Sequence, residues 1–129
     1  MEKKKILNFL AKYNYNYCEK NNLIIVKLEL SQQVTIQFDE SNKIILKDKL
    51  VGWNFLTGMI EMTLKNAFIY NLTGTILFGS IITYFENKEN GLNLNSLFLV
   101  FITWIILFST FYIVKLENFK NRIINCTRE

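Results

Sequence analysis

Two long stretches without a charged side chain dominate the hydropathy pattern of this chain. Residues 66–85 contain no Asp, Glu, Lys or Arg, and neither do residues 90–114, of which 97–114 are almost entirely apolar. An α-helix rises about 1.5 Å per residue and the hydrocarbon core of a bilayer is about 30 Å thick, so about 20 apolar residues cross it. We therefore predict transmembrane helices over residues 66–85 and 96–116, joined by a short polar external turn over 86–95.

A period of two residues marks the segments before the first span. Apolar and polar residues alternate over 23–30, 34–39 and 43–49, which predicts three half-buried strands in an antiparallel meander. Residues 13–17 offer a fourth strand. The apolar positions that share one face are Val26, Leu28 and Leu30 in the first strand, Val34, Ile36 and Phe38 in the second, and Ile44 and Leu46 in the third.

The apolar face of such a meander needs a cover. Residues 2–12 have helical periodicity that places Ile6, Leu7 and Leu10 on one side, so we expect a helix there to lie over the sheet. The meander and this helix together predict a small cytoplasmic α+β module over residues 1–51.

Residues 52–65 join the module to the first span. Trp53, Leu56, Ile60 and Leu64 recur at helical spacing, which predicts an amphipathic juxtamembrane helix with Glu61 and Lys65 paired on its other side. Two arrangements stay open: this helix lies in the headgroup layer, or it runs straight into the first span as one long helix.

Basic residues near the span ends predict the orientation in the membrane. Seven Lys and Arg residues flank the inner ends, whereas Lys88 alone lies in the connection, so both termini are expected in the cytoplasm. Abundant Asn and Ile with no Pro indicate an AT-rich genome, which favours a bacterial inner membrane. The amphipathic rings expected at the membrane interfaces are those of Trp53, Tyr70, Tyr84 and Tyr112.

The basic tail over residues 117–129 extends the second span. Leu116, Phe119 and Ile123 share a helical side, so the tail is expected to continue the span as a helix and then lie along the interface.

Small and polar residues within the spans predict how the two helices pack. Such residues let helix backbones approach closely, and a seven-residue repeat follows a left-handed helix pair. We therefore expect two seams to face each other inside the hairpin, with the alternative that they line a water path in an oligomer. The seams consist of Asn71, Gly74, Thr75 and Gly79 in the first span and Ser96, Thr103 and Thr110 in the second.

The composition argues against enzymatic chemistry. The chain has no His, and Cys18 and Cys126 are too far apart in sequence for a metal or redox motif. We predict no catalytic residue, no metal, no cofactor and no small-molecule substrate. The formal net charge is +4, and the excess of basic residues is concentrated at Lys3, Lys4 and Lys5 and in the tail after the second span. Anionic headgroups rather than nucleic acid are therefore the expected partners of this charge.

The expected fold class is an α+β integral membrane protein, in which a two-helix transmembrane hairpin follows a small cytoplasmic meander with an N-terminal helix. The expected function is that of a non-enzymatic binding or accessory protein, as a subunit of a membrane complex or an immunity-like protein. Its partners would be membrane lipids and a second copy or a larger membrane protein. An oligomeric pore-forming or membrane-disrupting effector, gated by the module, is the alternative, and a structural or lipid-binding role is a third hypothesis.

Overall fold

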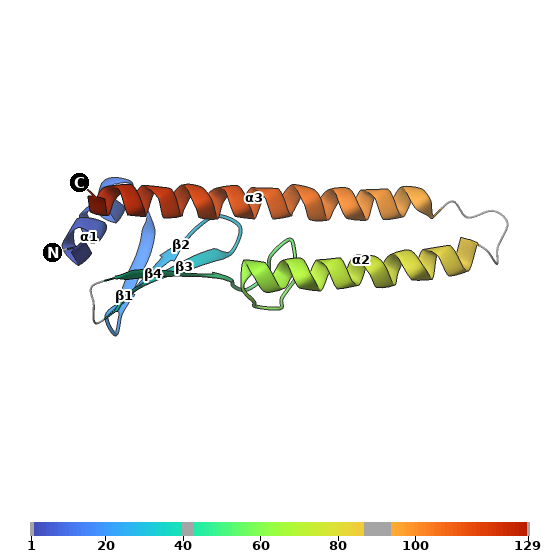
Figure 1. Ribbon diagram of the computed structural model, residues 1–129, viewed down its shortest axis with the longest axis horizontal. Coiled ribbons are helices and arrows are strands. Elements are labelled where there is room, and N and C mark those ends of the chain that lie inside the picture. The colour runs from blue at the N-terminus through green and yellow to red at the C-terminus, as the bar shows by residue number, and fades with distance from the viewer. Residues whose placement is uncertain (1, 40–42, 87–93, 129) are drawn as a thin grey trace.

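The structure is a computed structural model that describes residues 2–39, 43–86 and 94–128. It is an α+β fold with a four-stranded antiparallel sheet and three helices, two of them long and apolar (Figure 1). Along the chain the elements are α1 (Glu2–Lys12), β1 (Asn16–Lys20), β2 (Leu23–Lys27), β3 (Gln32–Phe38), β4 (Ile44–Leu50), α2 (Leu64–Glu86) and α3 (Asn95–Arg128).

The sheet confirms the predicted meander. Its strands follow chain order, β1-β2-β3-β4, and every neighbouring pair is antiparallel. The fourth strand predicted over residues 13–17 forms slightly later, as β1. Val26 lies opposite Val34, and Ile36 opposite Leu46, so the apolar positions align on one face. Leu30 is an exception, because β2 ends at Lys27 and Leu30 lies in the following turn with a φ of 53°.

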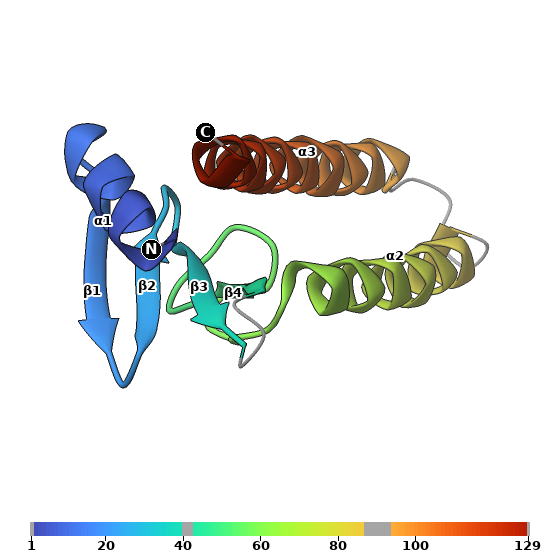
Figure 2. The ribbon, with the colours of Figure 1, turned by 60° about the vertical axis from the view of Figure 1, so that its left-hand side comes forward.

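Two helices cover the apolar face of the sheet. The side chains of Ile6 and Leu10 in α1 are fully buried there, which confirms the predicted helical cover. The C-terminal third of α3 joins the same core, and Figures 1 and 2 show it at the same end of the molecule as α1 and the strands. The helix residues buried in this core are Ile6 and Leu10 of α1, Leu64 and Ala67 of α2, and Tyr112, Leu116, Phe119 and Ile123 of α3.

This packing corrects the prediction for the tail. Residues 117–128 continue α3 as expected, but their apolar side faces the sheet and α1 rather than a membrane surface. The reason is that the eleven-residue α1 supplies two fully buried side chains, Ile6 and Leu10, and the rest of the apolar sheet face also needs burial. The core of the module, residues 1–51, is therefore completed by the C-terminal end of α3.

The helices α2 and α3 are long and apolar enough to cross a membrane, judged by length and composition. They lie side by side along the long axis of the molecule in Figure 1. Because α3 has 34 residues, without Gly or Pro, it forms one unbroken rod of about 51 Å. This rod links the helix pair directly to the module core. The predicted external turn falls mainly on residues outside the described part of the chain.

The predicted juxtamembrane helix over residues 52–65 is wrong, because residues 52–63 form a loop with two isolated bridges, Leu50 to Met62 and Asn54 to Gly58. Gly52 and Gly58 have positive φ angles of 62° and 64°, which interrupt a right-handed helix. The Asn54 side chain also accepts hydrogen bonds from two following backbone amides and so competes with helix formation. Neither of the two helical arrangements is present.

The beginning of α2 is fixed by the module. Asp48 Oδ2 of β4 accepts a hydrogen bond of 2.7 Å from the backbone amide of Leu64, the first residue of α2. Glu61, predicted to pair with Lys65, instead forms an ion pair of 2.7 Å with Lys49 of β4. These contacts attach the start of α2 and the loop before it to β4, an edge strand of the sheet.

Candidate functional site

The residues predicted as a seam on α2 lie on the side that faces α3 or the loop. Asn71 is buried, and its Nδ2 atom donates to the carbonyls of Ala67 (2.8 Å) and Leu56 (3.0 Å). Thr75 is half-buried and donates to the carbonyl of Asn71. A Cβ atom at Gly79 would lie 3.1 Å from Phe98 Cζ, so this glycine permits a close helix contact.

Gly74 differs from Gly79. A Cβ atom at Gly74 would have no atom of α3 or the loop within 4 Å in the described part of the chain, although the residue is half-buried. The close helix approach predicted at both glycines therefore holds for Gly79 alone of the two.

The predicted partner seam on α3 is wrong. Ser96, Thr103 and Thr110 are exposed on α3, and the hydroxyls of the two threonines donate to carbonyls of their own helix. The side of α3 that faces α2 and the loop is aromatic instead: Phe98, Phe101, Phe108 and Tyr112 lie there. A seven-residue repeat is compatible with any face of a helix, and burial of the large rings decides which face turns inward.

The loop over residues 52–63 fills the space between α2 and α3 next to the module. The Phe55 ring stacks on Phe108, with centroids 4.3 Å apart and planes 6° apart. Trp104 Nε1 donates to the Phe55 carbonyl at 2.9 Å, while Asn71 holds the neighbouring Leu56 carbonyl. Both long helices thus bind the backbone of this loop through side chains.

Tyr112 joins three elements at the centre of the molecule. Its side chain is fully buried, and its hydroxyl donates to the Leu30 carbonyl (2.7 Å) and accepts from the Phe55 amide (3.4 Å). Its backbone carbonyl accepts from Gln32 Nε2 at 3.1 Å. The prediction that the Tyr112 ring lies at a membrane interface is therefore wrong, because the protein itself satisfies the hydroxyl.

The other three predicted interfacial rings are exposed. Trp53, Tyr70 and Tyr84 have 57%, 49% and 58% of their surface accessible, so their place at an interface stays a prediction. Sequence reasoning missed Phe55 and Trp104. The position of Trp104 in the middle of an apolar run, far from its ends, was the available signal, since an indole N–H in such a place needs a partner.

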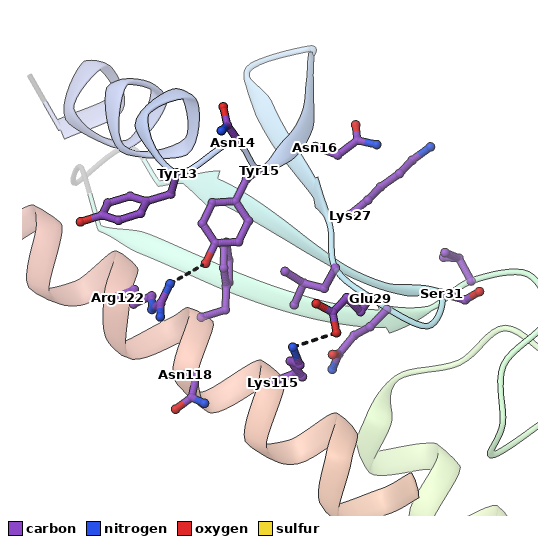
Figure 3. A pocket seen from close by; sticks show the side chains of 14 residues that line it. Tyr13, Asn14, Tyr15, Asn16, Lys27, Glu29, Ser31, Lys115, Asn118 and Arg122 are labelled. Carbon is purple, nitrogen blue, oxygen red and sulfur yellow. Dashed lines mark hydrogen bonds and ion pairs between the residues drawn. The ribbon is translucent and has the colours of Figure 1, made fainter.

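A cleft of about 840 Å³ lies between α3 and the module (Figure 3). Lys115 Nζ and Glu29 Oε2 form an ion pair of 2.8 Å across it, and Arg122 Nη1 donates to the Tyr15 hydroxyl at 3.4 Å. Lys27 also lines the cleft, although Figure 3 shows its side chain extending away from α3. The labelled lining residues are Tyr13, Asn14, Tyr15, Asn16, Lys27, Glu29, Ser31, Lys115, Asn118 and Arg122.

This cleft has the chemistry of a binding surface. Lys115 and Arg122 lie seven residues apart on one side of α3, where they offer cationic groups, and the tyrosines offer rings and hydroxyls. Within the part of the chain that the structure describes, no group of three His, Cys, Asp or Glu side chains could hold a metal ion. No protein-family model, curated protein or solved structure matches this chain.

Proposed function

We propose that this chain is a two-span protein of the bacterial inner membrane, with both termini in the cytoplasm, that acts without enzymatic activity as a binding or accessory protein. The observation that supports this role most directly is the continuity of α3, which runs from the apolar segment into the core of the module. Such a rod would hold the module in a fixed orientation at the membrane surface.

The position of the cleft fits this role. Lys115 immediately follows the apolar run 97–114, so the cleft between α3 and the module would lie just on the cytoplasmic side of the bilayer. The partner would be a larger membrane complex or the target of an immunity-like protein. It would bind to a rigid surface in this cleft. Preorganisation of this kind lowers the entropy cost of binding.

A pore gated by the module has less support. Gating needs a hinge between the module and the helix pair, and α3 contains neither Gly nor Pro where a helix would bend. Aromatic rings of Phe78, Phe98 and Phe101 occupy the outer part of the helix interface. The exposed hydroxyls that could line the path of an oligomeric pore are those of Thr73, Ser80 and Thr83 on α2 and Ser96, Thr103 and Thr110 on α3.

Expression of the chain in a bacterial host that lacks any partner separates the two functions. We expect normal growth and an unchanged membrane potential, measured with a potential-sensitive dye. Growth arrest with loss of potential would favour the pore. Reporter fusions test the membrane orientation in the same host: fusions after Arg128 should report the cytoplasm, and an insertion at Asn90 should report the outside.

Site-directed photo-crosslinking tests the cleft. A photoreactive amino acid at Asn118, which lines the cleft, should yield a discrete crosslinked product in the membranes of the native host. The same substitution at Asn121, which is exposed on α3 one turn further and does not line the cleft, is the matched control. Equal products at both positions, or none at Asn118, would argue against the cleft as the binding site.

A further inference from the structure

The backbone of the loop reaches well past the basic residues at the ends of the helix pair. Asn71, which binds the Leu56 carbonyl, lies six residues beyond Lys65 on α2, or about 9 Å along the helix axis. Phe108, which stacks on Phe55, lies seven residues before Lys115 on α3, or about 10 Å. Measured along either helix, the loop therefore reaches about 10 Å beyond the basic residue that ends the apolar segment, Lys65 or Lys115.

The tip of the loop has no unpaired backbone polar group. Each of the five amides from Asn54 to Gly58 donates a hydrogen bond within the protein, and each of the five carbonyls accepts one. Three of these partners are side chains of the long helices: Asn71, Trp104 and Tyr112. Irregular backbone at membrane depth is tolerated where protein groups satisfy it, because lipid tails offer no hydrogen bonds.

The side chains that surround this closed backbone are apolar and exposed. Met59 has 79% of its surface accessible, Trp53 57% and Ile60 49%. The Trp53 ring contacts the Phe55 ring, with centroids 4.7 Å apart, and Phe55 contacts Trp104 of α3, with centroids 5.6 Å apart, so these rings connect the loop to the exposed apolar surface of α3. In water this loop would expose a large apolar patch, and its backbone would gain no hydrogen bonds that it lacks within the protein.

We infer that residues 53–60 form a re-entrant loop embedded in the cytoplasmic leaflet, where Trp53, Met59 and Ile60 contact lipid acyl chains. A depth of about 10 Å lies within the half-thickness of the hydrocarbon core, about 15 Å. The inference rests on the proposed membrane insertion of α2 and α3. Acyl chains are the chosen occupant because the rings of Trp53, Phe55 and Trp104 connect the loop to the surface of α3 that would face lipid.

Spin-label accessibility in liposomes tests this inference with the full chain. In a Cys18→Ser, Cys126→Ser background, a nitroxide label is attached to Met59→Cys, and its collisions with oxygen and with a water-soluble nickel chelate are compared. Leu72→Cys, exposed on α2, is the lipid-facing control, and Lys27→Cys, exposed on β2, is the aqueous control. We expect the ratio of oxygen to nickel accessibility at Met59 to equal that at Leu72 and to exceed that at Lys27 several-fold.

Three other results would overturn the inference, each for a different reason. A nickel-accessible Met59 label beside an oxygen-accessible Leu72 label would place the loop in water while the proposed spans stay in the membrane. Nickel access at both positions would refute the membrane insertion itself. Low access to both reagents at Met59, with spin–spin broadening that dilution by unlabelled protein removes, would show that a second copy covers the loop.

Discussion

The helix pair is held together by different chemistry at its two ends. Next to the module, side chains of α2 and α3 donate hydrogen bonds to the loop between them, as Asn71 and Trp104 do to Leu56 and Phe55. At the far end, aromatic rings and Gly79 make the contacts between the helices, and Ile82 is buried there. Hydrogen bonds are directional, so the first end fixes one arrangement, whereas ring packing tolerates small shifts.

The hydrogen-bonded end is also the place where the helix pair is attached to the module. Tyr112 binds the β2–β3 turn and the loop at once, and four residues later Leu116 enters the core of the module. Among the described residues, none at the far end makes such a link to the module. Substitutions near the module should therefore affect the whole fold, while those at the far end should affect the spacing of α2 and α3.

The largest effect is expected where α3 enters the module. Ile123→Asp buries an unpaired carboxylate at a fully buried position and should destabilise the protein by several kcal/mol, with loss of protein in the cell. Ile124→Asp, at a neighbouring position with 41% of its surface exposed, is the control and should fold. Protein abundance and thermal unfolding measure both. Equal tolerance would mean that this part of α3 does not belong to the core.

At the far end, Gly79→Leu should force α2 away from Phe98 and cost about 1–3 kcal/mol, as overpacking does. Gly74→Leu is the matched control, since no described atom of α3 or the loop lies within 4 Å of its Cβ position, and it should cost much less. Crosslinking of cysteines placed on the facing sides of α2 and α3 would report the spacing. A larger loss for Gly74→Leu would contradict the helix contact described above.

At the module end, Asn71→Leu leaves the Leu56 carbonyl unpaired and should cost about 1–2 kcal/mol. Ser109 offers a contrast, because its buried Oγ has no hydrogen-bond partner in the described part of the chain. Ser109→Ala should therefore be neutral or slightly stabilising. Denaturant unfolding of the two variants in detergent compares them, and equal losses would argue against a special role for the bond between Asn71 and the loop.

The smallest effect is expected at the exposed pair of Glu61 and Lys49. The hydrogen bond from Lys49 lowers the pKa of Glu61, assisted by the Gly52 amide. A carboxylate with a lower pKa in the folded state stabilises the fold above its unfolded-state pKa, and this contribution disappears as the pH falls through the folded-state pKa. Lys49→Gln should reduce this pH dependence of unfolding, with the part due to the Gly52 amide remaining, whereas Lys65→Gln, at the partner predicted from sequence, should leave it unchanged.

Much of the fold could be predicted because local patterns determine it. The alternation through Val26, Val34 and Ile36 predicts strands with one buried face, and the structure buries all three fully. The charge-free runs predict two long apolar helices; α2 matches the first run closely, whereas α3 begins within the second run and continues 14 residues past its end. The helix predicted over residues 52–65 was wrong at residues 52–63, because the prediction rested on the helical spacing of Trp53, Leu56 and Ile60. The positive φ angles of Gly52 and Gly58 are incompatible with a helix.

The candidate site was less predictable because it depends on distant contacts. Asn71 and Gly79 were found through their small or polar side chains, but their partners on α3 were assigned to the wrong side. The seven-residue spacing of Thr103 and Thr110 says nothing about which face is buried, since both hydroxyls bond within their own helix. The cleft beside Lys115 and Glu29 joins residues 86 positions apart, and no local pattern indicates such a pair.

The sequence by itself determined the strands, the covering helix α1 and the two apolar helices, because each depends on periodicity and charge within one segment. Only the tertiary structure decided that α3 continues into the module core, that Tyr112 is buried there and that the loop at 52–63 lies between the long helices. The physical reason is that burial and hydrogen bonding are satisfied between segments. An apolar stripe such as Leu116, Phe119 and Ile123 needs a cover, but the stripe does not specify whether lipid or a β-sheet provides it.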